Sequence, residues 1–153
     1  MNYWLLKSEP SVFSIDDLAA APKQTTFWEG VRNYQARNLL RDRFQAGDHA
    51  FFYHSNTKIP GIAGVVQVLG AGYPDPTAVD PGSPYFDAAS DSANPRWYGV
   101  DVKLIRKLDR FISLTELKEP RDALADLILL RRGNRLSVMP ITTEQWNCIL
   151  GLE

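Results

Sequence analysis

Residues 49–69 have the sequence HAFFYHSNTKIPGIAGVVQVL, in which two apolar runs are separated by a polar segment that contains a proline. The first run is aromatic and the second is rich in valine, and both kinds of residue favour β-strands. We therefore predict one strand over residues 49–54 and another over residues 61–69. These two strands supply the sheet to which the other expected elements are added.

Further apolar runs predict three more strands, and periodic or capped segments predict helices between and after them. The strands are expected over residues 2–6, 97–106 and 136–139, the last of them ending before Pro140. The helices are expected to start at Ser14, to cover residues 31–44, to cover residues 114–132 in pieces broken near Pro120, and to start again at Thr142.

Residues 70–96 are the loop-rich part of the chain, because five prolines and three glycines exclude long regular elements there. Tyr85, Phe86 and Trp97 nevertheless indicate packing rather than disorder. Short strands, many turns and inserted helices together predict an α+β domain built on a small curled sheet or barrel. Alternating βαβ units are absent, which argues against a Rossmann-type sheet.

The composition is that of one ordinary globular domain, with 153 residues of which 44% are hydrophobic and 23% are charged. The net charge of −1 excludes a histone-like coat of positive charge but leaves room for a local basic groove. No apolar stretch approaches the ~20 residues that a membrane span needs. The N-terminus also lacks the features of a signal peptide, so we expect a soluble intracellular protein with no membrane partner.

Common signatures of catalysis and metal binding are missing: there is no G-x-S-x-G, no P-loop and no H-E-x-x-H. His49 and His54 lie five residues apart on a predicted strand, so they point to opposite faces and cannot hold one metal ion. Cys148 is the single cysteine, which excludes an internal disulfide and a cysteine-based zinc cluster. We therefore predict no catalytic residue, no metal site and no cofactor.

Four segments combine aromatic side chains with small polar or basic ones at the ends of predicted elements. They are Lys7–Pro10, Trp28–Tyr34, His54–Asn56 and Asn134–Ser137. Rigid elements present binding groups at such junctions. A flat aromatic platform, amide and hydroxyl groups, and cations for phosphates are together the chemistry of a nucleobase pocket.

Each of these residues also has a purely structural interpretation. Trp28 could pack in the core, and Asn33 could face solvent from a helix. The polar segment His54–Asn56 could lead a strand into a turn, and Arg135 could brace the loop after Gly133.

Six stretches of the sequence resemble the EVE domain family. They are YWLLKSEP (3–10), GVRNYQARN (30–38), FFYHSN (51–56), PGIAG (60–64), NPRW (94–97) and NRLSVMP (134–140). The resemblance implies one EVE domain over residues 1–153, with a PUA-like fold in which a small β-barrel is flanked by short helices. It also implies kinship with readers of RNA modifications such as YTH domains.

Members of this family are thought to bind modified bases of DNA or RNA in a pocket. We therefore expect a non-catalytic reader that holds an extruded base in an aromatic and polar pocket. The expected base-binding residues are Trp28, Asn33, Tyr34, His54, Ser55, Asn56 and Ser137. The expected phosphate-binding residues are Lys7, Ser8, Arg37, Arg96 and Arg135. Eukaryotic members usually carry a basic N-terminal extension that this chain lacks, so we expect a bacterial-type, cytoplasmic protein.

Two alternatives stay open at this point. The chain could be an enzyme acting on a modified base or nucleotide, with His54 as general base and Ser55 or Lys7 assisting. It could also bind a free small molecule or a protein, which the near-zero net charge allows. Trp4 is expected in the core because it lies inside an apolar strand. Trp28 is expected to be partly exposed as a stacking platform, so that its loss costs less stability.

Overall fold

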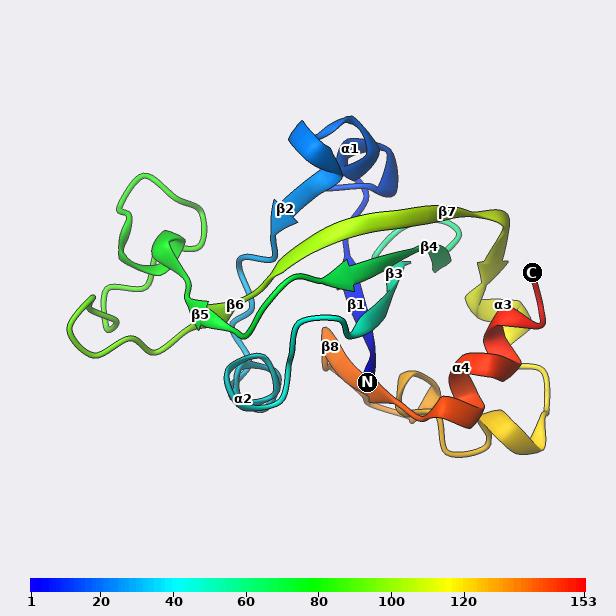
Figure 1. Ribbon diagram of the computed structural model, residues 1–153. Helices are drawn as coiled ribbons and strands as arrows, with labels where there is room; N and C mark the ends of the chain where they lie inside the picture. The colour runs from blue at the N-terminus through cyan, green and yellow to red at the C-terminus, as the bar shows by residue number, and fades with distance from the viewer.

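A curled six-stranded sheet forms the centre of the computed structural model, which describes residues 1–153 (Figure 1). The strands are β1 (Tyr3–Ser8), β2 (Thr25–Phe27), β3 (His49–His54), β4 (Gly61–Val68), β5 (Tyr73–Pro74), β6 (Tyr98–Gly99), β7 (Asp101–Ser113) and β8 (Val138–Ile141). The α-helices are α1 (Ile15–Ala20), α2 (Tyr34–Asp42), α3 (Leu114–Leu117) and α4 (Thr143–Leu150). Short 3₁₀ helices cover Pro22–Gln24, Pro76–Val79, Asp122–Leu124 and Ile128–Leu130.

The order of strands in the large sheet is β2-β7-β4-β3-β1-β8, while β5 and β6 form a small separate ribbon. Register shifts interrupt the β3–β4 ladder once and the β4–β7 ladder twice. Such bulges bend strands and increase their twist. The sheet curls accordingly (Figure 1). Its two edge strands, β2 and β8, do not pair with each other, so the barrel stays open between them. The predicted α+β class is confirmed, with the barrel only half closed.

The two strands that decide the fold are confirmed almost to the residue, as β3 and β4, and they are neighbours in the sheet. β1 lies on the other side of β3 and pairs with it in parallel, whereas every other ladder of the sheet is antiparallel. The lack of repeated βαβ units does exclude a Rossmann sheet. It gives no sign of this single parallel pair.

Three predicted boundaries are wrong for identifiable reasons. The helix expected from residue 31 begins at Tyr34, because the Asn33 side chain caps it by accepting from the Ala36 N–H at 3.0 Å. The strand expected over residues 97–106 is divided between β6, in the small ribbon, and β7, which continues to Ser113 with charged side chains on its exposed face. The last strand includes Pro140, which is tolerated because β8 is an edge strand. The short strands β2 and β5 are not predicted at all.

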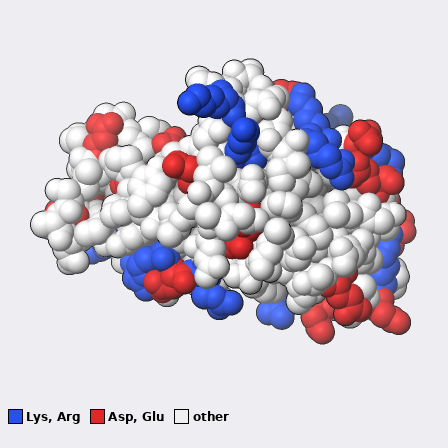
Figure 2. Space-filling model, in the orientation of Figure 1, with Lys and Arg blue, Asp and Glu red and all other residues white.

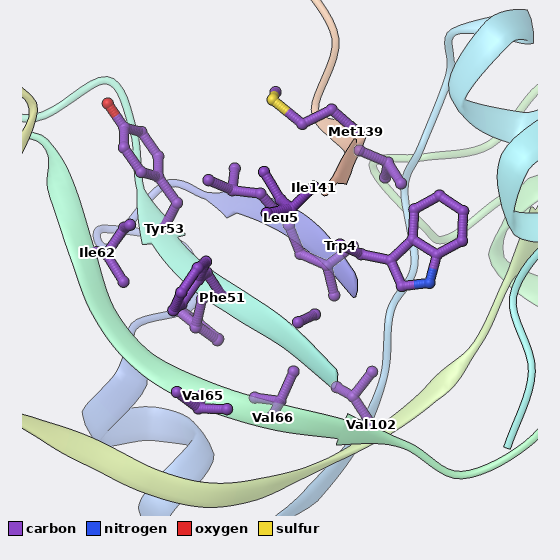
Figure 3. Packing of buried hydrophobic residues seen from close by; sticks show 14 of the residues in the cluster. Trp4, Leu5, Phe51, Tyr53, Ile62, Val65, Val66, Val102, Met139 and Ile141 are labelled. Carbon is purple, nitrogen blue, oxygen red and sulfur yellow. The ribbon is translucent and has the colours of Figure 1, made fainter. Parts of the chain in front are cut away.

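Trp4 occupies the core, as its place in an apolar strand predicts (Figure 3). Its indole stacks on Phe44 with ring centres 4.2 Å apart and donates from Nε1 to the buried Asp48 at 2.9 Å. The Asp48 carboxylate also accepts from the N–H groups of Asn2 and Gln45. The start of β1 is thereby joined to the turn that precedes β3.

Trp28 is not the exposed platform that its position before a glycine indicates. Only 6% of its surface is accessible, and it belongs to the same hydrophobic cluster as Trp4. Its ring meets Phe52 edge to face at 5.3 Å, and its backbone N–H donates to the Val100 carbonyl at 2.7 Å. β2 pairs with β7, and this bond extends the pairing by one residue beyond each strand, to Trp28 and Val100. The Trp28 side chain points into the core.

The loop-rich segment 70–96 projects from one end of the sheet and is fastened to it by Asp75 (Figure 1). The Asp75 side chain is fully buried and accepts from the Gly30 N–H and from Arg32, each at 3.0 Å. Its other oxygen accepts from the backbone and hydroxyl of Thr77 at 2.8 and 2.6 Å. We call this set of contacts the Asp75 clasp.

Burial by itself would raise the pKa of Asp75. The hydrogen bonds from Thr77, Gly30 and Arg32 outweigh that effect and hold the pKa below the ordinary aspartate value. The ionised carboxylate is therefore the form that the clasp stabilises.

Aromatic rings and guanidinium groups alternate beside the clasp. Arg32 lies over Trp97 at 5.4 Å, Trp97 stacks on Tyr34 at 4.8 Å, and Arg37 lies over Tyr34 at 5.0 Å. Trp97 also donates from Nε1 to Asp87 at 2.7 Å. The packing expected for this loop-rich part is confirmed for Tyr85 and Trp97, whereas Phe86 is 42% exposed.

Replacing either buried tryptophan should destabilise the protein to a similar extent. We expect Trp4→Ala and Trp28→Ala each to lower the free energy of unfolding by about 3–5 kcal/mol, the usual cost of truncating a buried aromatic residue. Ile59→Ala, at a side chain that is 62% exposed, is the control and should change it by less than about 0.5 kcal/mol. Urea unfolding measures all three. If Trp28→Ala behaved like the control, Trp28 would not be part of the core.

Loss of the Asp75 charge should make the free energy of unfolding less dependent on pH in the acidic range. The folded pKa lies below the unfolded value of about 3.9, so the stabilisation is complete above that value and disappears as the pH falls through the folded pKa. We expect Asp75→Asn to be less stable than the wild type at pH 7, with the difference shrinking below about pH 4. Urea unfolding between pH 3 and pH 7 tests this, with exposed Asp126→Asn as control. A difference that stayed constant over this range would contradict the assignment.

Candidate functional site

A cavity of about 490 Å³ opens where the curled sheet fails to close. One side is formed by residues around the end of β1 and just before β8, and the other by β2 and the residues that follow it. Ser55 and Tyr85 complete the lining from two other parts of the chain. The volume lies within the range of about 300–1,000 Å³ that is typical of small-molecule and cofactor pockets.

Aromatic and aliphatic side chains make up nearly half of the lining. They are Val12, Phe13, Phe27, Trp28, Val31, Tyr85 and Leu136. Trp28 contributes the small part of its surface that the core leaves accessible. Gly30 has a φ of +82°, and a Cβ there would lie 2.7 Å from the Tyr85 ring. A glycine is therefore required for the loop carrying Tyr85 to close against this wall.

Two cations and two carboxylates line the same cavity. Lys7 and Arg135 form no ion pair, and burial lowers the pKa of the Lys7 ammonium group. Glu9 accepts a hydrogen bond from the Asn56 side chain. Glu29 has no hydrogen-bond partner; burial raises its pKa, the charge of Asp75 adds to the rise, and Arg32 opposes it. The site therefore carries balanced charge.

Six of the residues predicted to bind a base or its phosphates come together at this cavity. They are Lys7, Ser8, Trp28, Ser55, Arg135 and Ser137. They meet because Lys7 donates its backbone N–H to the Ser137 carbonyl at 2.8 Å and Ser55 donates to the Ser8 carbonyl at 2.9 Å. Three segments far apart in the sequence are thereby held side by side.

Three other predicted residues line a second hollow of about 240 Å³, which is formed by α2 and the loop before β6. They are Tyr34, Arg37 and Arg96. Tyr34 is 52% exposed, and Arg37 donates to the Arg96 carbonyl at 2.6 Å. The side chain of Arg96 lies 3.8 Å from Asp87. Their assignments as base-binding and phosphate-binding residues stay predictions.

The remaining three predicted residues, Asn33, His54 and Asn56, line neither hollow. Asn33 caps α2, and Asn56 donates to Glu9. His54 accepts from the Ile15 N–H through Nε2 at 3.1 Å. Hydrogen bonds within the protein thus use a polar group of each, and two of the three join segments far apart in the sequence, which the residue types alone do not reveal.

His54 is poorly placed for the general base that the enzyme alternative needs. Burial lowers its pKa, with the nearby charge of Asp16 opposing the shift, so the imidazole is neutral at physiological pH. The Nε2 lone pair that would take a proton is already bonded to the Ile15 N–H. That bond joins β3 to the start of α1.

Sequence reasoning missed several residues of the cavity, of which Glu29 and Tyr85 are the most informative. Glu29 lies inside one of the four junction segments but is passed over there in favour of its aromatic and amide neighbours. Tyr85 reaches the cavity because the Asp75 clasp holds a distant loop near Gly30 and because Arg32 donates to the Tyr85 carbonyl at 3.2 and 2.7 Å. The sequence around Tyr85 contains no pattern that predicts such a contact.

The surface carries mixed charge rather than one basic face. On the side shown in Figure 2, Lys and Arg form separate groups, several of them beside Asp or Glu. Seven ion pairs lie within 4.0 Å, most of them exposed. No group of three His, Cys, Asp or Glu side chains is arranged to hold a metal ion. None of the helices has the length and apolar character needed to cross a membrane.

Solved structures and curated proteins closely similar to this chain have been found. A crystal structure of a protein from Pseudomonas putida superposes with a TM-score of 0.93 at 48% identity, covering 98% of each chain. The structure of human THYN1 protein in complex with 5-methylcytosine-containing DNA gives 0.93 at 45% identity, covering 99% of this chain and 97% of the other. Human thymocyte nuclear protein 1 is 46% identical over 168 residues, covering 99% of this chain and 74% of its own.

These similarities bear out the fold expected from the sequence, a PUA-like arrangement of a curled sheet with short flanking helices. The family model for the EVE domain matches residues 2–152. This chain belongs to the EVE domain family.

Proposed function

We propose that this chain is a non-catalytic reader of modified bases in nucleic acid, and that DNA containing 5-methylcytosine is one of its ligands. The observation that carries the proposal is the relative solved with 5-methylcytosine-containing DNA, which matches 99% of this chain at a TM-score of 0.93. At 45% identity over that length, the two chains share the scaffold on which a ligand site is built.

The cavity supports the proposal by its size and chemistry. Its volume of about 490 Å³ suits a single base, and its lining combines indole and phenyl surface with hydroxyl and charged groups. A base inside a duplex cannot reach such a cavity, so it must be extruded, which costs a few kcal/mol of lost stacking and pairing. We therefore expect weak binding to ordinary duplex and tighter binding where the base is already unpaired.

Lys7 and Arg135 support contacts to the nucleic-acid backbone. Both border the cavity and neither has a carboxylate partner, so their charges are free to meet phosphates. The guanidinium groups of the second hollow are candidates for phosphates farther along the strand. The net charge of −1 limits the contribution of bulk electrostatics, so affinity has to come from these local groups.

RNA is a second candidate ligand, since an extruded base presents the same edges in either nucleic acid. Cytoplasmic placement, expected from the sequence, also remains a proposal. Binding of a free small molecule is the competing function. It differs by its response to salt, because only contacts to phosphates release counterions.

Titration of labelled oligonucleotides by fluorescence anisotropy tests the proposal. We expect tighter binding to DNA with 5-methylcytosine opposite an abasic site than to the same DNA with cytosine. The affinity should fall as salt rises from 50 to 200 mM. Lys7→Gln and Arg135→Gln should each reduce the slope of log affinity against log salt by about 1.

Lys118→Gln, at an exposed lysine that lines neither hollow, is the matched control and should leave both affinity and slope unchanged. RNA of the same sequence, with and without 5-methylcytosine, is titrated in parallel. Equal and negligible binding of modified and plain oligonucleotides would refute the reader. Salt-independent binding of free nucleobases alone would favour the small-molecule function.

A further inference from the structure

The two cations of the cavity lie at one end of the curled sheet together with Glu9, and Glu29 lies alone at the other end. Lys7 lies at the end of β1 and Arg135 lies just before β8, at one end of the strand order. Glu29 follows β2, at the other end. Glu29 forms no ion pair within 4.0 Å, so no cation of the cavity neutralises its charge at contact distance.

The backbone fixes the place of Glu29, while its side chain stays free. The preceding residue, Trp28, donates its N–H to Val100 at 2.7 Å, and the following residue, Gly30, donates to Asp75 at 3.0 Å. Between these anchors, the Glu29 carboxylate accepts no hydrogen bond. Glu29 is an exposed residue, but burial of part of its side chain leaves the carboxylate less hydrated than a free one, and such a group gains more from a new hydrogen bond than a fully hydrated one.

The other carboxylate of the cavity is differently placed. Glu9 already accepts from Asn56, in the turn that follows β1. Glu29 is therefore the carboxylate of this cavity that has neither oxygen atom bonded within the protein.

We propose that Glu29 selects bases that carry an exocyclic amino group, by accepting a hydrogen bond from the N4 amine of an extruded cytosine-type base. This inference rests on the proposed function and goes beyond it, since it names the edge that is read and the residue that reads it. Carboxylates accept hydrogen bonds from the cytosine N4 amine in known recognition of base edges.

The division of charge matches the polarity of cytosine. Its amine is a donor at position 4, and its O2 carbonyl is an acceptor on the other side of N3. With the amine on Glu29, the O2 atom is directed away from the carboxylate, toward the other side of the cavity, where the Ser137 hydroxyl is a donor. Thymine and uracil carry an O4 acceptor in place of the amine, and this oxygen would meet the carboxylate with repulsion.

The comparison of 5-methylcytosine with thymine isolates this contact, because the two bases carry the same methyl group and differ only at the N3–C4 edge. Each base is placed opposite an abasic site in the same duplex, so that the cost of breaking a base pair is removed. We expect the wild-type protein to bind the 5-methylcytosine duplex at least about tenfold more tightly, the effect of one hydrogen bond to a charged group.

Glu29→Gln keeps the shape of the side chain and removes its charge. A glutamine amide can accept from the amine or donate to O4, so the preference for 5-methylcytosine over thymine should fall to about twofold or less. The preference for 5-methylcytosine over cytosine should persist, because that difference lies in the methyl group. Glu144→Gln, at an exposed residue in the first turn of α4, removes one negative charge elsewhere and should leave both ratios at wild-type values.

The outcomes separate this inference from the proposed function. If the wild type binds none of the duplexes, or does not distinguish 5-methylcytosine from cytosine, the reader function fails. If it makes that distinction but Glu29→Gln keeps the wild-type ratio of 5-methylcytosine to thymine, only the role of Glu29 is overturned. A wild-type preference for thymine would place the carboxylate opposite the N3–H and would also overturn it. Thermal melting of each variant checks that the fold is intact.

Discussion

The buried carboxylate of Asp75 is the contact on which the shape of the site depends. It ties the loop-rich segment 70–96 to the chain between β2 and α2 through Gly30 and Arg32. With both oxygens occupied by donors, ionisation is stabilised although the side chain is buried. The clasp brings Tyr85 against Gly30, where a larger residue would not fit. The Asp75 contacts therefore join the wall that carries Trp28 and Glu29 to the loop that closes over it, and the bonds from Arg32 to the Tyr85 carbonyl add to this connection.

The position of the cavity follows from the way in which the sheet curls. β1 is inserted in parallel beside β3, which puts β1 and β8 at one end of the sheet and leaves β2 at the other. Register shifts along β4 bend these ends toward each other without joining them. The opening is thus lined by strand ends and loops, where most side chains are not buried in the hydrophobic core. A fully closed barrel of this size would fill that space with its own side chains.

The sequence predicts the regular elements well wherever the signal is local. β3, β4 and the helix starts at Ser14 and Thr142 depend on neighbouring residues, and all are found. Six of the predicted ligand residues reach one cavity because strand ends converge there. Trp28 differs from its expected exposure because β2 is too short to recognise, and Tyr85 is missed because the Asp75 clasp and the bonds from Arg32 bring it in. Long-range contacts of this kind produce no periodic pattern in a single amino-acid sequence, so they cannot be predicted from it.

Selectivity and affinity have different origins in a site of this kind. The chain carries a net charge of −1, and its cations are dispersed among acidic side chains (Figure 2). Non-specific attraction to phosphates is therefore small, and it cannot offset the few kcal/mol needed to extrude a paired base. Under that constraint, contacts inside the cavity decide whether binding occurs at all. In the proposed role of Glu29, discrimination arises inside the cavity, since a base with the wrong edge both loses a hydrogen bond and leaves the carboxylate without a donor.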